Sequence, residues 1–173
     1  MKELAYIHDE GEVPASLQNI PFLESFTQTD LDDILNSSSI IECEPGDVIL
    51  SEGNEAHRMF ILLTGTLEVT KEDEHIAEFS GTGHLFGELA ALEDESRSAT
   101  VVAKDKVYCL AIDHKFLEDI RPKEQNPAFY AALYGFIAKV MAERLKRTSE
   151  EYSRLEKDYH DLLAKCGEDV PVN

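Results

Sequence analysis

The chain has 173 residues, enough for one domain with a sizeable core plus an extended element. Its 35 Asp and Glu residues outnumber its 16 Lys and Arg residues, and the resulting net charge of −19 disfavours contact with nucleic acid and with anionic membranes. Hydrophobic residues make up 43% of the chain but form no run long enough to cross a membrane. The sequence also shows no secretion signal, so we expect a cytoplasmic protein.

The predicted elements begin after a polar stretch. Residues 1–13 show no apolar pattern and are expected to form a flexible lead-in. Thr29–Asp32 predicts the start of a helix with a capping-box-like pattern. From Ile40 onward, glycine-containing turns separate seven short runs of strand length: 40–43, 48–50, 59–63, 67–70, 75–79, 100–103 and 107–112. Short strands at this spacing are typical of a sandwich or barrel. A helical pattern resumes at 113–119.

After Pro127, Gly135 is the one helix-breaking residue before Gly167. This predicts about 40 residues of helix, roughly 60 Å long. Apolar or neutral residues recur at alternating spacings of four and three, at Tyr134, Ala138, Met141, Leu145, Thr148, Tyr152, Leu155, Tyr159 and Leu162. Sustained heptads favour a coiled coil, so we expect a parallel homodimer through residues 134–162. The alternative is a single amphipathic helix lying on its own domain.

Residues 86–100, FGELAALEDESRSAT, have the chemistry of a sugar-phosphate clamp. Backbone N–H groups at the start of a short helix attract phosphate. The Arg97 guanidinium can donate two parallel hydrogen bonds to phosphate oxygens, and the Glu88 carboxylate can accept a hydrogen bond from a sugar hydroxyl. Two other interpretations stay open, because Glu88 could cap backbone N–H groups of its own loop and Arg97 could be a surface arginine.

Four stretches together resemble the cyclic-nucleotide-binding domain family: EPGDVILSEGN at 44–54, MFILLTGTLEV at 59–69, FGELA at 86–90 and RSAT at 97–100. The resemblance runs from about residue 17 to about residue 120. It implies a mainly β fold, a jelly-roll-like β-roll flanked by helices. We therefore expect a nucleotide-binding domain over 14–120, a long dimerisation helix over 127–166 and a tail over 167–173.

The resemblance also implies roles for single residues. Glu88 would receive the ribose 2′-OH, and Arg97 would pair with the cyclic phosphate. Backbone N–H groups near Gly87 and Leu89, with the hydroxyl or amide of Ser98, would complete the phosphate shell.

The long helix adds to this resemblance. MAERLKRTSE at 141–150 resembles the dimer helix of the bacterial catabolite activator branch (CRP/FNR-like), and SRS at 96–98 sides with that branch, since kinase regulatory subunits usually have Pro-Arg-Ala there. By that resemblance Thr148 and Ser149 would read the adenine, and Arg144 would link the helix to Glu88. From the heptad alone, Thr148 could instead set only the register, and Arg144 could be a solvated helix arginine. The branch continues into a DNA-binding domain, whereas this sequence ends at Asn173, so we expect no nucleic-acid partner.

These patterns predict a homodimeric cAMP sensor that signals to a protein effector. The alternatives are an interaction scaffold that binds no nucleotide, a cGMP sensor, and a phosphodiesterase. We expect no enzyme activity, because no nucleophile and base can be paired. We expect no metal or cofactor either, because His57, His75 and His84 lack ligand spacing.

Overall fold

The computed structural model of the protein describes residues 1–6, 17–55, 57–88, 96–113, 119 and 126–168. It contains two compact units, Met1–Tyr134 and Gly135–Asn173. Within the described ranges, no helix is both long enough and apolar enough to traverse a bilayer.

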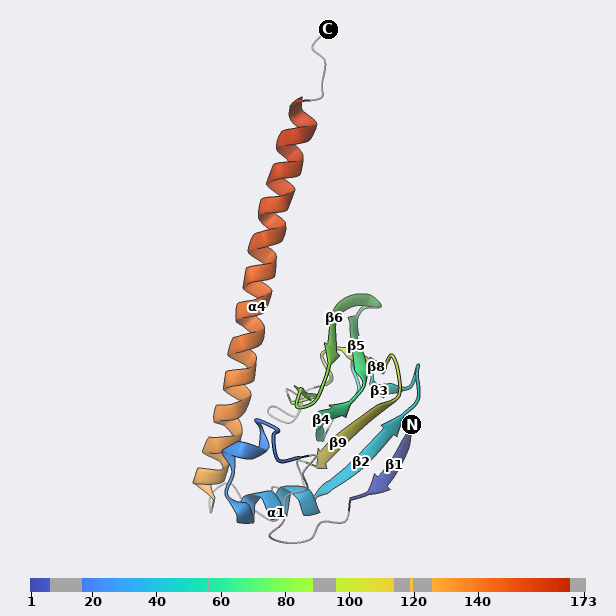
Figure 1. Cartoon of the computed structure of the whole chain (residues 1–173), viewed down its shortest axis with the longest axis vertical. Coiled ribbons are helices and arrows are strands. Elements are labelled where there is room, and N and C mark those ends of the chain that lie inside the picture. Colours follow the sequence, from blue (N-terminus) through green and yellow to red (C-terminus); the bar gives the residue numbers. More distant parts are fainter. Residues whose placement is uncertain (7–16, 56, 89–95, 114–118, 120–125, 169–173) are drawn as a thin grey trace. The chain divides into compact units, whose positions relative to one another are not determined.

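Two antiparallel sheets build the first unit (Figure 1). One sheet has the strand order β1-β2-β9-β4-β7, with bounds Lys2–Ala5, Ser38–Cys43, Val107–Asp113, Arg58–Thr64 and Leu85–Phe86. The other has the order β3-β8-β5-β6, with bounds Val48–Leu50, Thr100–Ala103, Thr66–Lys71 and Glu74–Ser80. The expected mainly β fold of the β-roll type is confirmed, and all seven predicted runs lie in strands.

Side chains of both sheets form the core between them. Alternate residues of a strand point to opposite faces, so each strand contributes every second side chain. The core cluster contains Ile41, Cys43, Leu50, Phe60, Leu62, Leu67, Phe86, Val101, Ala103, Val107, Cys109 and Ala111. Burial raises the pKa of the Cys109 thiol to about 12, which keeps the thiol in its neutral form in the core.

The helix α1 (Gln28–Asn36) begins one residue earlier than the expected start at Thr29. Its N-cap is Thr27, whose Oγ1 accepts a hydrogen bond from the Asp30 N–H at 3.3 Å. The Thr27 N–H donates to the Asp30 carboxylate at 3.1 Å, which completes a capping box. The box therefore joins Thr27 to Asp30 rather than starting at Thr29, and it explains why the Asp30 side chain is buried.

Two short strands were not expected. Lys2–Ala5 lies in the stretch taken as a flexible lead-in, yet it pairs with β2 from Lys2 opposite Glu42 to Ala5 opposite Ser39. All four side chains of β1 are exposed, so its sequence has no apolar alternation to reveal it. The two-residue β7 pairs with β4, with Phe86 opposite Phe60. The expected helical stretch 113–119 lies almost wholly outside the described residues.

The last element is the helix α4, which runs without a break from Pro127 to Glu168 (Figure 1). The predicted span was 127–166, and Gly135 lies inside the helix. A short 3-10 helix, η1 (Leu23–Ser25), and the first turns of α4 belong to the first unit, where the rings of Phe26 and Phe129 pack 5.3 Å apart. The tail beyond residue 168 is outside the described residues.

Candidate ligand-binding site

Two buried charged side chains in the described part of the first unit, Glu88 and Arg97, lie in the segment between β7 and β8. The buried polar or charged residues are Asp30, Ser38, Glu88 and Arg97. Asp30 belongs to the capping box, and the Ser38 hydroxyl donates to the Ile34 carbonyl at 2.6 Å. Glu88 and Arg97 remain, with exposed fractions of 2% and 8%. Because burying a charge is costly unless it is compensated, this pair marks the candidate site.

The backbone of Arg97 is held by the turn that follows β3. The Arg97 N–H donates to the Asn54 carbonyl at 2.9 Å, and the Gly53 N–H donates to the Arg97 carbonyl at 2.9 Å. One residue before Gly53, the Glu52 N–H donates to the Thr100 hydroxyl at 3.1 Å. These hydrogen bonds hold the Arg97 backbone against the turn that follows β3, so the side chain extends from a fixed backbone position.

The Arg97 side chain lies against two backbone carbonyls. Its Nη1 donates to the Gly87 oxygen at 2.7 Å, and its Nη2 donates to the Arg58 oxygen at 2.8 Å. The guanidinium carbon lies 5.9 Å from the centre of the Phe60 ring, within the range of a cation–π contact. The guanidinium is thus oriented by neutral acceptors, and a phosphate oxygen would be a stronger one.

The environment of Arg97 also shifts its protonation. Burial lowers the pKa of the guanidinium from 12.5 to about 10, while the Glu88 carboxylate acts in the opposite direction and stabilises the charged form. A pKa of about 10 leaves Arg97 cationic at neutral pH. The site therefore holds a positive charge, although the chain carries a net charge of −19.

Gly87 connects β7 to the site and needs to be a glycine. Its φ is +72°, a region that side chains with a Cβ rarely adopt. A Cβ at this position would lie 2.7 Å from the Arg97 Nη1, 3.3 Å from Leu50 Cδ1 and 3.4 Å from Phe60 Cδ2. The absence of a side chain lets the Arg97 guanidinium reach the Gly87 carbonyl.

Glu88 follows directly and is almost completely buried. Burial lowers the pKa of Arg97 and the Glu88 carboxylate partly opposes this shift, so the two opposite charges lie close enough to interact. An ionised carboxylate only accepts hydrogen bonds, so it can accept one from a hydroxyl group of a ligand. A buried acceptor beside a buried cation suits a ligand that carries both a hydroxyl and an anionic group.

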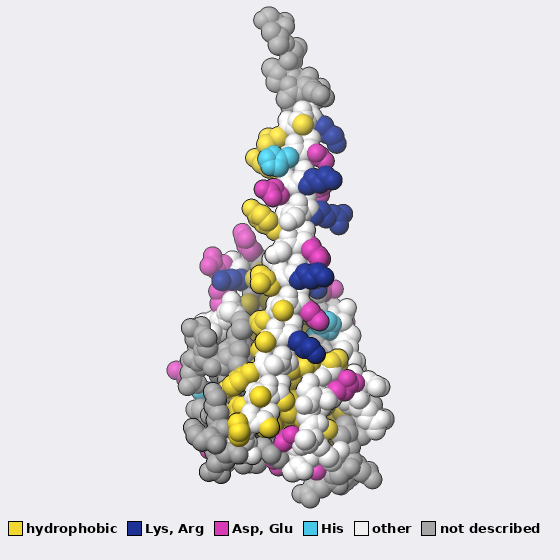
Figure 2. Space-filling view, turned by 90° about the vertical axis from the view of Figure 1, so that its left-hand side faces the viewer, with side chains coloured by type: hydrophobic (Ala, Val, Ile, Leu, Met, Phe, Trp, Pro, Cys, Tyr) yellow, Lys and Arg dark blue, Asp and Glu magenta, His cyan; other side chains and the backbone are white. Residues whose placement is uncertain are grey.

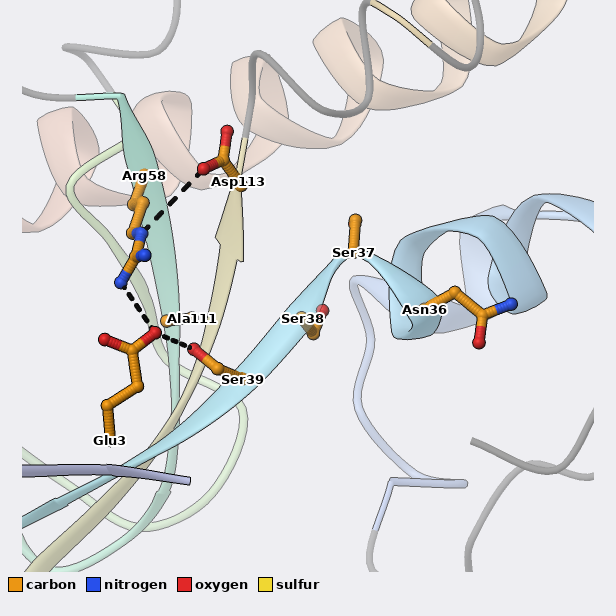
Figure 3. Close-up of a pocket in the computed structure, with 8 residues that line it drawn as sticks. All are labelled: Glu3, Asn36, Ser37, Ser38, Ser39, Arg58, Ala111 and Asp113. Carbon is orange, nitrogen blue, oxygen red and sulfur yellow. Dashed lines mark hydrogen bonds and ion pairs between the residues drawn. The ribbon is translucent and has the colours of Figure 1, made fainter. Parts of the chain in front are cut away.

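The side chain of Arg58 lines a separate polar hollow of about 220 Å³ (Figure 3). There the Glu3 carboxylate accepts from Arg58 Nη1 at 3.0 Å and from the Ser39 hydroxyl at 2.8 Å, and Asp113 lies 3.9 Å from Arg58 Nε. The Ser39 hydrogen bond, and then Arg58, lower the pKa of Glu3. These contacts tie β1 to β2, β4 and β9.

The structure describes most of the predicted site residues. It brings together Gly87, Glu88 and Arg97, whereas the side chain of Ser98, the residue after Arg97, is exposed. Leu89 lies outside the described residues. The three residues of α4, which are Arg144, Thr148 and Ser149, belong to the second unit, so their roles stay predictions.

Two further residues belong to this site and were not expected there. Arg58 contributes its backbone carbonyl, and Phe60 contributes its ring face. A carbonyl contact has no side-chain signature, so the sequence held nothing that could reveal Arg58. Phe60 lies in the predicted run 59–63, but its place at the site depends on the pairing of β4 with β7, where its ring stacks 5.3 Å from that of Phe86.

The described geometry agrees with the comparison to known families. Residues 40–123 match the family model described as the cyclic nucleotide-binding domain. Residues 40–123 form a domain of this family. Both halves of the candidate site, Gly87–Glu88 and Arg97, lie inside the matched residues of the cyclic nucleotide-binding domain.

Similar sequences occur in cyclic-nucleotide-dependent protein kinases and in a kinase regulatory subunit. The cGMP-dependent protein kinase of Plasmodium berghei is 29% identical over 159 residues, which are 91% of this chain and 17% of that protein. The cAMP-dependent protein kinase regulatory subunit of Hypocrea atroviridis is 34% identical over 91 residues, which are 53% of this chain and 20% of that protein. The chain thus spans about a fifth or less of these two proteins.

Among solved structures, the catabolite activator protein of Thermus thermophilus has the same fold. It aligns with a TM-score of 0.59 and 20% identity over 79% of this chain and 63% of that chain. The likeness to the catabolite activator that residues 141–150 suggested therefore holds at the level of the fold.

Proposed function

We propose that the protein is a cytoplasmic, non-enzymatic sensor that binds cAMP in its β-roll and signals to a protein partner through α4. The observation that carries the proposal is the buried pair of opposite charges, Glu88 and Arg97, beside Gly87. The relatives that are named for cAMP and cGMP support the class of ligand.

In this proposal the cyclic phosphate takes over the hydrogen bonds of Arg97. Nη1 and Nη2 now donate to the Gly87 and Arg58 carbonyls, and the phosphate oxygens would replace these neutral acceptors. A charged acceptor makes the stronger hydrogen bond, and it also compensates a cation whose burial is costly. The exchange would free a carbonyl at the start of β4 and another at the end of β7, so ligand binding would change contacts in both strands.

In this proposal, α4 contacts the adenine of cAMP and transmits the signal to the partner protein. Thr148 and Ser149 would contact the adenine N6, which would favour cAMP over cGMP, and Arg144 would link the helix to Glu88. A homodimer would form within residues 134–162, because apolar or neutral residues recur there at heptad spacing. The ligand would act by binding one arrangement of the helix pair more tightly than another.

The first prediction concerns the nucleotide. Isothermal titration of nucleotide-stripped protein with cAMP should show saturable binding near one molecule per chain, with weaker binding of cGMP. Tighter binding of cGMP would make the protein a cGMP sensor instead. If neither nucleotide gave heat or raised the melting temperature, the domain would be an interaction scaffold.

The second prediction concerns Glu88. We expect Glu88→Gln to weaken cAMP binding about tenfold, because a hydrogen bond to a charged group contributes about 1.5–3 kcal/mol. The control is 2′-deoxy-cAMP, which lacks the hydroxyl that Glu88 would receive. The native protein should discriminate between the two ligands about tenfold and the variant much less. Equal discrimination by both proteins would assign Glu88 to the structure of its loop rather than to the ribose.

A further inference from the structure

The C-terminal half of α4 carries a stripe of large apolar side chains that no described residue covers. Its members are Tyr152, Leu155, Tyr159 and Leu162, with exposed fractions of 68%, 67%, 60% and 59%. Their spacing places them at successive a and d positions of a heptad, so they line one side of the helix. We call these four residues the distal stripe. An exposed apolar stripe of this kind marks an interaction surface.

Acidic residues border the distal stripe on both sides. With Tyr152 and Tyr159 at heptad position a, Glu151 and Asp158 fall at position g and Glu156 falls at position e. Between residues 146 and 157 the basic residues fall at b, c and f, away from the stripe, at Lys146, Arg147, Arg154 and Lys157. Lys165 falls at g, three residues after Leu162. Figure 2 shows the same division, with hydrophobic side chains along one side of α4 and Lys and Arg side chains along the other.

This charge pattern opposes parallel pairing of the distal stripe with a second copy. In a parallel pair, a g residue faces the next e residue of the partner helix, so Glu151 of one chain would face Glu156 of the other. In an antiparallel pair centred on the stripe, Glu156 would face Glu156 and Asp158 would face Asp158, whereas Glu151 would face Lys165. Like charges at these positions disfavour an association, whereas opposite charges select the partner. Glu151 also lies 3.8 Å from Arg147 of its own helix, a pair too exposed to remove the repulsion.

We infer that the distal stripe binds a different protein, through an amphipathic helix whose a and d positions are apolar and whose e and g positions are Lys or Arg. This inference rests on the proposed function, because it names the class of partner that receives the signal from α4. The homodimer would then be held by the earlier heptad positions, from Tyr134 to Thr148. The acidic borders of the distal stripe would disfavour a parallel second copy and select the basic helix.

The experiment uses the full chain and a labelled synthetic peptide with Leu at a and d and Lys at e and g. Fluorescence anisotropy at physiological salt should show that this peptide binds at least tenfold more tightly than two comparison peptides. One has Glu at e and g, and the other has the same Lys and Leu composition in scrambled order. The scrambled peptide measures the general attraction of a basic chain to a protein of net charge −19. Equal binding of the scrambled peptide would overturn the inference.

Charge reversal provides the matched control. Glu151→Lys with Glu156→Lys should weaken binding of the Lys peptide at least tenfold and turn the preference toward the Glu peptide. Glu143→Lys with Glu150→Lys changes the net charge by the same amount at f positions, on the side away from the stripe, and should change binding less than about twofold. Equal losses in the two double variants would contradict a specific docking surface.

The remaining outcomes separate the possible occupants. A Leu155→Cys variant is made in a Cys166→Ser background. Nearly complete formation of an interchain disulfide, together with no binding of the Lys peptide, would show that a second copy covers the distal stripe. The same samples are titrated with cAMP. Nucleotide binding without peptide binding would refute the inference alone, whereas loss of nucleotide binding would refute the proposed function.

Discussion

Arg97→Ala should lower the affinity for cAMP at least a hundredfold while the β-roll stays folded. The native guanidinium offers two terminal nitrogens that are already aligned on the Gly87 and Arg58 carbonyls. Hydrogen bonds to a charged group contribute about 1.5–3 kcal/mol each, and about 1.4 kcal/mol corresponds to a tenfold change in affinity. Loss of both bonds to the phosphate therefore accounts for the expected effect, which isothermal titration measures.

Arg97→Lys separates charge from geometry. The ammonium keeps the positive charge but lacks the planar pair of donors, so we expect an affinity between those of the native protein and Arg97→Ala. The thermal midpoint of the ligand-free variants should move by only a few degrees, because removal of a buried charge offsets part of the lost hydrogen bonds. Unchanged cAMP affinity in a folded Arg97→Ala variant would remove Arg97 from the site.

The β-roll was predictable because its strands repeat one local pattern. Each strand from β2 to β6, and also β8 and β9, combines an apolar run with a glycine-containing or polar turn, and such a pattern needs no distant information. β1 is different, because its four exposed side chains show no alternation and its strand form depends on pairing with Ser39–Glu42. The helix cap was misplaced by two residues because both Thr27 and Thr29 are competent caps. Only the position of the Asp30 carboxylate distinguishes them.

The candidate site was predictable from its side chains but not from its backbone. Gly87, Glu88 and Arg97 lie near one another in sequence and carry the chemistry of the site in their residue types. The Arg58 carbonyl comes from a strand that is distant in the chain, and it binds Arg97 only because β4 and β7 are neighbours. The contributions of α4 depend on how two units meet, which heptad spacing alone does not determine.

The second large effect is expected for Gly87→Ala, which should weaken both the fold and the binding of cAMP. The added Cβ would lie 2.7 Å from Arg97 Nη1, so the guanidinium would have to leave the Gly87 carbonyl. The positive φ of 72° adds about 1–2 kcal/mol of backbone strain. We expect a loss of about 2–3 kcal/mol in the free energy of unfolding, measured by urea denaturation, and a loss of at least tenfold in cAMP affinity.

Gly46→Ala is the matched control for backbone strain. Gly46 has a φ of +89°, and a Cβ there would meet no atom within 4 Å. The control should therefore lose about 1–2 kcal/mol of stability and keep the native affinity for cAMP. If Gly46→Ala and Gly87→Ala changed the affinity equally, the effect at Gly87 would come from general destabilisation rather than from displacement of Arg97.

A double variant tests whether Gly87 acts through Arg97. Residues that act through one interaction give effects that do not add, whereas independent residues give effects that do. In the Arg97→Ala background the guanidinium is absent, so Gly87→Ala should cost about 1–2 kcal/mol of stability from the backbone alone and should lower cAMP affinity no further. A second tenfold loss of affinity would show that the Gly87 backbone contacts the ligand itself. The guanidinium would then be only one of two groups that hold the phosphate.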